Sequence, residues 1–306
     1  MSPRTRRITA ALVGALLLLP ALAFATERLV AVDPEGDGTL VVLLMGSDQG
    51  PPRDELPTEG RADAIQLLFV SAERDAATFV SIPRDSWLDV GGIGETKINA
   101  CLTRGAQNCA DSLEEAFGIE IAGWMVTSMW GMADAVNEFS GCPSGPEDCD
   151  RGLVVNVDFT CTSQCGGLPI AERGEQRLNG YEALTYARYR KGREGGDFGR
   201  SQGQAELLAI AHREVAEDGS VARMMDALRI LRRHTVTSFT MPQLVRLGID
   251  ALRVDPAAVQ RQLIPSTTAT IGAASAVRLL DGAYPMVDDA YDDGVLNGSA
   301  PGSVAP

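Results

Sequence analysis

Hydrophobic positions along the chain follow two periods, and together they predict a mixed α/β fold. Short apolar runs typical of buried strands lie at 39–46, 64–72, 77–83, 124–128, 153–159, 258–265 and 275–281. Apolar residues recur at helical spacing in 109–118, 131–139, 177–188, 201–217, 220–234 and 241–252. We see no internal repeat, and one domain covering residues 39–291 is the simplest division of the chain.

Turn and cap residues mark several boundaries. Arg74 and Asp75 separate two apolar runs, so residues 64–83 read as a hairpin. Gly118 suits the end of a helix, and Asn179 suits the start of one. The polar segments 47–60 and 85–98 are expected to be loops. Residues 27–38 have the composition of a linker and residues 292–306 that of a flexible tail.

The N-terminal segment predicts export. Arg4, Arg6 and Arg7 precede an apolar run that ends near an Ala-Phe-Ala sequence at 23–25. Residues 1–26 are therefore either a signal peptide cleaved after Ala25 or an uncleaved membrane anchor. Both interpretations place residues 27–306 outside the cytoplasm, so we expect an extracytoplasmic protein, secreted or anchored at the cell envelope.

The cysteines fit an oxidising compartment. The chain has an even number of them, namely Cys101, Cys109, Cys142, Cys149, Cys161 and Cys165. Their order favours three local disulfides, 101–109, 142–149 and 161–165, although sequence alone leaves other pairings open. Metal binding is the competing interpretation, but no CxxC pair is present, and the two histidines, His212 and His234, lie far downstream.

Charge narrows the possible partners. The formal net charge is -14, which argues against nucleic acid, because binding phosphate backbones needs a positive surface. The basic residues are nearly all arginines. There is no Walker A loop or nucleophile elbow, and neither Ser47 nor Ser81 has an obvious histidine partner. A Ser-His-Asp hydrolase is therefore not expected.

Charged residues nevertheless gather where strands or helices begin and end. They lie in GSD at 46–48, RAD at 61–63, SIPRD at 81–85 and ARYRKGREGGDFGR at 187–200. Loops at strand ends meet at one edge of a sheet, so the arginines are expected to converge with the acids there. Guanidinium groups match phosphate oxygens, carboxylates suit Mg²⁺, and the glycines at 195, 196 and 199 would let backbone approach a ligand. The alternative is that each acid–arginine pair is a solvated salt bridge.

These segments, in this order, resemble the LytR-CpsA-Psr family. The resemblance rests on LLMGSD (43–48), RAD (61–63), FVSIPRDSWLDV (79–90) with KINA (97–100), LNGYEALTYARYR (178–190) and GDFGR (196–200). It implies a three-layer α/β/α fold around a mixed central sheet. It also implies a bacterial enzyme that transfers a glycopolymer from a polyprenyl diphosphate to peptidoglycan or another cell-wall acceptor, next to the membrane surface.

The resemblance also implies roles for individual residues. Asp48 and Asp63 would bind Mg²⁺. The diphosphate would be held by Arg61, Arg84, Arg188, Arg190 and Arg200. The catalytic set would be Asp63, Arg84, Asp197 and Arg200, with Asp197 either orienting the arginines or acting as a base. Asp85, Lys97 and Asn99 would shape the site.

An apolar pocket for the polyprenyl chain would come from residues such as Leu67, Phe69, Val126, Leu184 and Leu207. Ordinary core packing is the alternative interpretation for each of them.

Two positions depart from the family pattern. Gly50 stands where the family usually has an arginine, and Gly203 lies in the SQGQ run that follows GDFGR. A glycine inside a helix costs about 1 kcal/mol relative to alanine. The same residues would also suit a hydrolase that cleaves the diphosphate with water, or an inactive homologue that only binds the lipid diphosphate.

Overall fold

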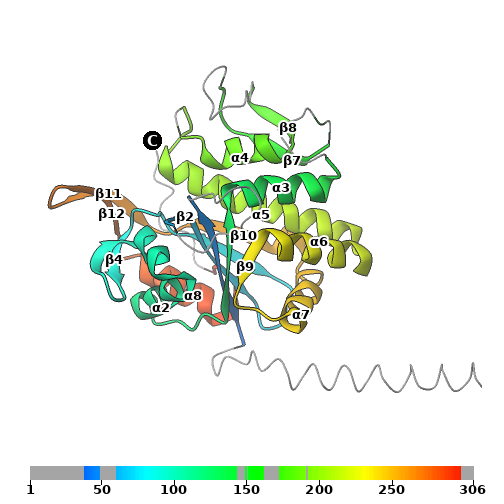
Figure 1. The fold of residues 1–306 in the computed structure, drawn as a ribbon. Helices are drawn as coiled ribbons and strands as arrows, with labels where there is room; N and C mark the ends of the chain where they lie inside the picture. The colour runs from blue at the N-terminus through cyan, green and yellow to red at the C-terminus, as the bar shows by residue number, and fades with distance from the viewer. Residues whose placement is uncertain are drawn as a thin grey trace, which may run out of the picture.

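A six-stranded mixed sheet forms the centre of the molecule (Figure 1). The computed structural model describes residues 38–48, 60–142, 149, 151–161, 172–190 and 192–297. The sheet has the strand order β10-β3-β2-β1-β6-β9. Its strands are β1 (Leu40–Ser47), β2 (Ala62–Val70), β3 (Ala77–Ser81), β6 (Gly123–Ser128), β9 (Thr235–Thr237) and β10 (Val259–Leu263). β1, β2 and β3 are antiparallel neighbours, whereas β6 runs parallel to β1 and β10 parallel to β3.

Among the described residues, three two-stranded sheets accompany the central one. They are formed by β4 (Trp87–Val90) with β5 (Gly94–Lys97), β7 (Leu153–Val157) with β8 (Gly174–Leu178), and β11 (Ser266–Ile271) with β12 (Ala274–Leu279). The helices are α2 (Ala106–Phe117), α3 (Met129–Ser140), α4 (Gly180–Arg188), α5 (Asp197–Asp218), α6 (Val221–His234), α7 (Met241–Ala251) and α8 (Ala283–Asp293). Two short 3-10 helices are η1 (Ile98–Arg104) and η2 (Pro256–Ala258).

Alternation along β1 explains why helices cover both faces of the sheet. Val41 and Leu43 belong to a core that includes side chains of α2 and α8. Leu40 and Val42 belong to a different core, formed with α6 and α7. Successive side chains of a strand point to opposite faces, so a strand that is apolar throughout needs a helical layer on each side. The predicted three-layer α/β/α fold is confirmed.

A second, smaller core lies beside the sheet. It joins the β7–β8 hairpin to α4 and α5, with Phe159 and Tyr186 buried at its centre and stacked on each other. In Figure 1 this unit lies above the central sheet, together with α3. Helix α5 packs against β2, β3 and β10 as well as β7, so it connects the two units.

The strands and helices expected from the hydrophobic pattern are present, and several further elements were missed. Residues 85–98 are not a loop throughout, because β4 and β5 form a hairpin there. The short or polar strands β8, β9 and β11 and helix α8 were not predicted. Helix α4 begins at Gly180 rather than 177, with Asn179 as its N-cap in a capping box, and Gly118 ends α2 in the left-handed conformation as expected.

Two boundaries differ in a way that matters for the site and the domain. Helix α5 begins at Asp197 rather than 201, so the GDFGR sequence opens a helix and is not a loop ahead of one. Helix α8 ends at Asp293, and the Leu296 N–H donates to Gln260 Oε1, so position 291 falls inside packed structure. The proposed leader at 1–26, nearly all of the linker at 27–38 and tail residues 298–306 lie outside the described residues.

Two of the three expected disulfides are confirmed. Cys101 is bonded to Cys109, and Cys142 to Cys149, so these four cysteines are not metal ligands. Cys161 is also disulfide-bonded, but its predicted partner Cys165 lies outside the described residues, and that pairing stays a prediction. Within the part of the chain that the structure describes, no helix combines the length and the apolar character needed to cross a bilayer.

Candidate functional site

The sheet brings three of the charged motifs together on one side, where the ends of three adjacent strands meet. β1 ends, β2 begins and β3 ends on this side, because the three strands are antiparallel neighbours. Asp48 and Arg61 meet across the first junction, where the Asp48 N–H donates to the Arg61 carbonyl at 2.9 Å. The Arg61 N–H donates in return to Asp48 Oδ1 at 2.8 Å. These bonds fix the Asp48 carboxylate at the mouth of the β1–β2 pair.

Asp63 and Arg84 form the central ion pair of the site. Arg84 Nη1 donates to Asp63 Oδ1, and both side chains are mostly buried. Asp85 lies next to this pair, with its Oδ2 3.9 Å from Arg84 Nε and its Oδ1 3.2 Å from Lys97 Nζ. Asp85 and Lys97 therefore form a second, more exposed pair that flanks Arg84.

Asn99 supports this loop through its backbone. The Asn99 N–H donates to the Arg84 carbonyl at 3.0 Å, and the Ile98 N–H donates to the Ser86 carbonyl at 2.8 Å. Asn99 itself is buried at the start of η1. The KINA segment thus fixes the backbone that carries Arg84.

The GDFGR sequence provides the other half of the site. Gly195 and Gly196 have φ of 73° and 56°, a conformation that favours glycine, and they turn the chain into α5. Asp197 is the first residue of the helix, and its Oδ1 lies 3.1 Å from Arg200 Nη2 and 3.5 Å from Arg190 Nη1. Asp197 therefore lies between two arginines, one buried and one exposed.

A buried polar bridge joins α5 to the sheet. Gln66 Nε2 donates to the Ser201 carbonyl at 3.2 Å, and Ser81 Oγ donates to Gln66 Oε1 at 2.7 Å. Ser81 Oγ also lies 3.3 Å from the Ser201 carbonyl. Since Ser81 ends β3 and Ser201 follows Arg200, this bridge sets the position of Arg200 relative to the loop that carries Arg84.

Electrostatic coupling shows that these groups share one site. Burial opposes the charged form of Arg84, but Asp63, followed by Asp85 and Asp197, outweighs it and raises the pKa of Arg84. Burial lowers the pKa of Arg200, Asp197 opposes the shift, and the nearby charge of Arg84 adds to it. Both guanidinium groups are therefore partly desolvated and interact with the carboxylates of Asp63 and Asp197 and with each other.

The two central arginines keep unused hydrogen-bonding capacity. The Nε atoms of Arg84 and Arg200 are buried and have no hydrogen-bond acceptor among the described residues. A buried, unsatisfied donor on a charged group costs free energy, which a bound anion would recover.

Arg61 and Arg188 are more loosely placed. Both side chains are exposed, and neither forms a salt bridge within the described part of the chain. Arg61 lies at the site edge through its backbone bonds to Asp48, whereas Arg188 lies at the end of α4. The structure thus brings together acids and arginines of four motifs.

Arg193 has a structural role that the sequence did not show. Its side chain is buried, its Nε donates to Asp158 Oδ2 at 2.9 Å, and its guanidinium lies 4.4 Å from the centre of the Tyr186 ring. It also donates to the Tyr186 carbonyl at 3.2 Å. Of the two arginines in REGGDFGR, only Arg200 faces the site. In the sequence, only Gly203, a glycine inside an amphipathic helix, indicates that a large side chain packs against this part of α5.

Position 199 also has no room for a side chain, because neighbouring groups, including Arg193, occupy the space beside it. A Cβ at this position would collide with the Glu194 carbonyl and come within 3.2 Å of the Arg193 side chain. The expectation that Gly199 admits a ligand is therefore not supported, because the turn before α5 already fills that space.

The residues proposed to line an apolar pocket are core residues. Leu67, Phe69 and Val126 are buried in the core shared with α2 and α8, and Leu207 is buried in the second core. Leu184 is 6% exposed. Core packing, the alternative interpretation, accounts for the burial of all five, and the apolar pocket for a polyprenyl chain stays a prediction.

Carboxylates at the site could supply only part of a metal's coordination shell. Asp48 and Asp63 lie at the same sheet edge, one bonded to the Arg61 backbone and one to Arg84. Among the described residues, no group of three or more His, Cys, Asp or Glu side chains converges as a preformed metal centre would.

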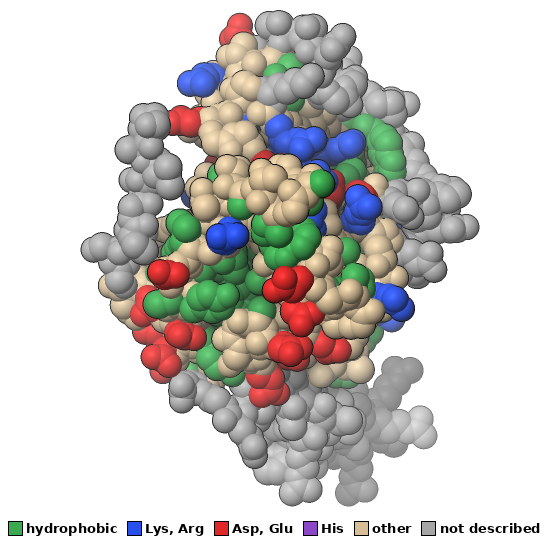
Figure 2. Space-filling view, turned by 90° about the vertical axis from the view of Figure 1, so that its left-hand side faces the viewer, with side chains coloured by type: hydrophobic (Ala, Val, Ile, Leu, Met, Phe, Trp, Pro, Cys, Tyr) green, Lys and Arg blue, Asp and Glu red, His purple; other side chains and the backbone are tan. Residues whose placement is uncertain are grey.

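Figure 2 shows one face of the molecule, on which most Lys and Arg side chains lie above most of the acidic ones, so charge is segregated even though the net charge is -14.

Comparison with known proteins finds similar sequences and similar folds. The chain is 29% identical over 216 residues to the polyisoprenyl-teichoic acid–peptidoglycan teichoic acid transferase TagU of Bacillus licheniformis, covering 70% of this chain and 64% of that protein. The match thus spans less than two thirds of the relative's length. A solved structure of B. subtilis TagV covers 83% of this chain and 96% of its own, with 21% identity and a TM-score of 0.69. A structure of TagT bound to LI-WTA covers 87% and 95%, with 20% identity and a TM-score of 0.64.

These structural matches establish a shared fold. The sequence profile of the LytR_cpsA_psr family matches residues 23–289, which include every charged motif described above. The chain therefore belongs to the LytR_cpsA_psr family.

Proposed function

We propose that this protein transfers a glycopolymer from a polyprenyl diphosphate carrier to peptidoglycan or another cell-wall acceptor, outside the cytoplasm and next to the membrane surface. The observation that carries the proposal is the pairing of Asp63–Arg84 with Asp197–Arg200 at one sheet edge, with buried Nε donors left unsatisfied. The name of the B. licheniformis relative, a teichoic acid transferase, supports the same chemistry.

The arginines would bind the diphosphate. Arg84 and Arg200 are held in place by carboxylates and by the Gln66–Ser81 bridge, so little ordering is needed when the ligand binds. Guanidinium groups form bidentate bonds with phosphate and keep their charge at any physiological pH. Arg190, which is exposed and paired only at 3.5 Å, would reach the outer phosphate oxygens, with Arg61 and Arg188 at the entrance.

Asp48 and Asp63 would hold Mg²⁺ together with oxygens of the diphosphate. Two carboxylates suffice, since Mg²⁺ usually keeps several waters and is completed by substrate phosphates. The ion, when bound, would neutralise charge on the leaving group. Because Asp63 also pairs with Arg84, its carboxylate would link the metal position to the arginine cluster.

The reaction would join the acceptor to the polymer and release the lipid. An acceptor hydroxyl oxygen attacks the phosphorus that carries the glycopolymer, the bond from that phosphorus to the bridging oxygen of polyprenyl phosphate breaks, and the hydroxyl proton passes to solvent. Negative charge then grows on the leaving phosphate, where Arg84 and Arg200 stabilise it. Attack at the sugar carbon would instead release polyprenyl diphosphate. Asp197 lies between Arg190 and Arg200, so its position favours orienting these arginines over accepting the proton from the acceptor.

Calorimetric titration with a short polyprenyl diphosphate, such as geranylgeranyl diphosphate, tests the binding step. We expect Mg²⁺-dependent binding by the parent and at least tenfold weaker binding by Arg200→Gln. Arg213→Gln is the matched control, because Arg213 is exposed on the same helix and far from the cluster. Equal binding by the parent and Arg200→Gln would refute the site.

A turnover assay tests what accepts the polymer. With a lipid-linked glycopolymer and cell-wall acceptor, we expect polymer on the acceptor and polyprenyl phosphate in solution. Release of unattached polymer at the same rate without acceptor would identify a hydrolase instead. Tight binding without either product would identify an inactive homologue.

A further inference from the structure

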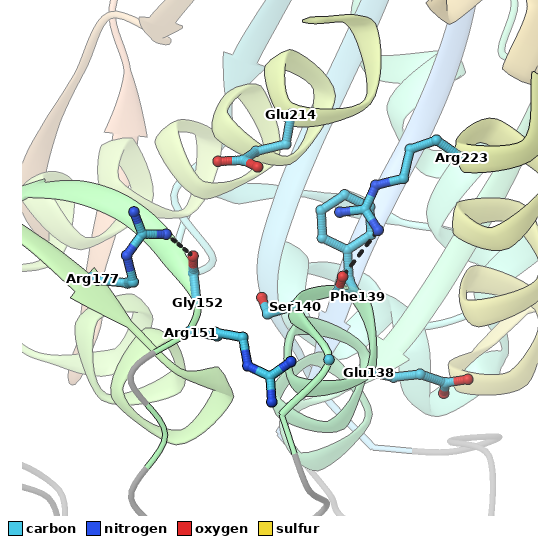
Figure 3. A pocket seen from close by; sticks show the side chains of 9 residues that line it. Glu138, Phe139, Ser140, Arg151, Gly152, Arg177, Glu214 and Arg223 are labelled. Carbon is cyan, nitrogen blue, oxygen red and sulfur yellow. Dashed lines mark hydrogen bonds between the residues drawn. The ribbon is translucent and has the colours of Figure 1, made fainter. Parts of the chain in front are cut away.

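A second arginine cluster surrounds a polar pocket at the far end of α5. The pocket has a volume of about 410 Å³ and lies between the end of α3, the β7–β8 hairpin, α5 and the start of α6. Figure 3 shows Arg151, Arg177 and Arg223 around it, with Glu214 on the α5 side. Asp197 and Glu214 lie near opposite ends of α5, which at 1.5 Å per residue places them about 25 Å apart. The pocket is therefore distinct from the proposed diphosphate site.

Arg223 is fixed in one wall of the pocket. Its guanidinium lies 3.7 Å from the centre of the Phe139 ring, and its Nη1 donates to the Phe139 carbonyl at 3.1 Å. These contacts use one face of the group and one of its five N–H donors, so several donors remain for a ligand.

The opposite wall is fixed by Arg177 and Arg151. Arg177 Nη1 donates to the Gly152 carbonyl at 3.2 Å. Arg151 lies against the backbone of Gly141, since a Cβ there would be 3.2 Å from Arg151 Nη1. The Cys142–Cys149 disulfide joins the two segments that carry Gly141 and Arg151, and so supports this contact.

The negative groups near the pocket are largely neutralised. Glu138 pairs with Arg233 and, at 3.1 Å, with His234 Nε2. The carbonyls at the end of α3 are also occupied, because Gly141 and Cys142 donate to the Glu138 and Asn137 carbonyls. Glu214 makes no salt bridge within the described residues, so three guanidinium groups face one uncompensated carboxylate.

We propose that this pocket binds an oxyanion, a phosphate or carboxylate group, carried on a sugar. Three guanidinium groups line this one pocket, and guanidinium N–H groups match the oxygens of phosphate and carboxylate. Glu214 can accept hydrogen bonds from hydroxyls and would favour a ligand that also carries sugar hydroxyls. If the protein is a glycopolymer transferase, the ligand is a charged repeat of the polymer, remote from its diphosphate end. That identification rests on the proposed function, whereas the anion pocket does not.

Nuclear magnetic resonance tests the pocket directly. The parent protein is titrated with inorganic phosphate, glucose 1-phosphate, glucuronate and neutral glucose, and the amides of Gly141 and Gly152 are followed. We expect saturating shifts of both amides with at least one of the anionic sugars and none with glucose. The two anionic sugars separate a phosphate ligand from a carboxylate ligand. Absence of saturating shifts with every anion would overturn the proposal.

Variants assign the effect to the arginines. Arg151→Gln/Arg177→Gln should weaken anion binding at least tenfold, while Arg229→Gln, an exposed arginine on α6 outside the pocket, should bind as the parent does. Equal binding by the double variant would exclude the pocket. If that variant unfolds, the single change Arg177→Gln at an exposed side chain gives the same comparison.

One further variant separates the two sites. Arg200→Gln should lose the lipid diphosphate yet keep the shifts at Gly141 and Gly152. Failure of the transferase proposal would leave this anion binding intact, and failure of the anion pocket would leave lipid diphosphate binding intact.

Discussion

The guanidinium of Arg193 fills the space beside Gly203 where a side chain would begin. A Cβ at residue 203 would lie less than 3.0 Å from three atoms of that group. Position 203 must therefore be glycine for Arg193 to pack against Asp158 and Tyr186. The low helix propensity of glycine is the cost of that packing. The departure from the family pattern at residue 203 thus has a structural cause in the packing of Arg193.

Replacing Gly203 by alanine should destabilise the fold. Arg193 would have to leave its position, and its buried charge would lose the Asp158 partner, so we expect a loss of about 2–3 kcal/mol in the free energy of unfolding. Urea denaturation measures it. Gln202→Ala, at an exposed position one residue earlier, should change the value by less than about 0.5 kcal/mol. An alanine at 203 as stable as the parent would show that Arg193 can move freely.

Replacing Arg84 by lysine should weaken diphosphate binding and make it sensitive to pH. Asp63, Asp85 and Asp197 raise the pKa of Arg84, and a base with a raised pKa keeps its proton to a higher pH. A lysine has an ordinary pKa of about 10.4, so the variant should lose further affinity as the pH rises above about 10, whereas the parent should lose less. At neutral pH the missing bidentate geometry should already cost about tenfold.

Calorimetric titrations across this pH range check the prediction. Arg213→Lys, an exposed substitution on α5, controls for general effects of alkaline pH. Parallel pH profiles for Arg84→Lys and the parent would contradict a direct role of the Arg84 charge.

Removing the Ser81 hydroxyl should disturb both stability and binding. Gln66 Oε1 would lose its buried donor, and an unsatisfied buried polar atom costs about 1–3 kcal/mol. Because this bridge also positions the backbone next to Arg200, Ser81→Ala should weaken lipid diphosphate binding severalfold at a temperature where the protein stays folded. Ser275→Ala, an exposed serine in β12, is the control for both measurements. Unchanged affinity would restrict Ser81 to a purely structural role.

Breaking the Cys142–Cys149 disulfide should affect the second arginine cluster selectively. The closed loop is short, so Cys142→Ser/Cys149→Ser should lose about 2–2.5 kcal/mol of stability. It should also weaken sugar-anion binding at Gly141 and Gly152, because Arg151 would no longer be held against Gly141. Binding of the lipid diphosphate should not change. Weakened binding at both sites would indicate a general loss of structure instead.

Sequence was most informative where a segment is apolar on both faces or carries several charges at a strand end. The buried runs of β1, β2 and β3 predicted both the strands and the edge at which Asp63 and Arg84 meet. β8, β9 and β11 read GEQRL, TVT and STTATI, and they are strands because of their hydrogen-bonding partners, which no local pattern reports.

Side-chain burial was the least predictable property. Arg193 and Arg200 belong to the same charged sequence, yet one packs on Tyr186 and the other faces the site. Residues Arg151, Arg177 and Arg223 come from separate segments, and only the arrangement of α3, α6 and the β7–β8 hairpin places them around one pocket. The leucines and aromatics proposed for a lipid pocket could not be distinguished from core residues, because both environments select the same side chains.

The two ends of the central strands carry different segments, so a label can be attached at one end without altering the residues at the other. The ends of β1 and β3 and the start of β2 carry the charged motifs, whereas the connection from α2 to β6 lies at the other end and carries none of them. Glu120 is exposed in that connection. A fluorophore or short affinity tag attached there should report on folding and localisation while the ion pairs around Arg84 keep their native arrangement.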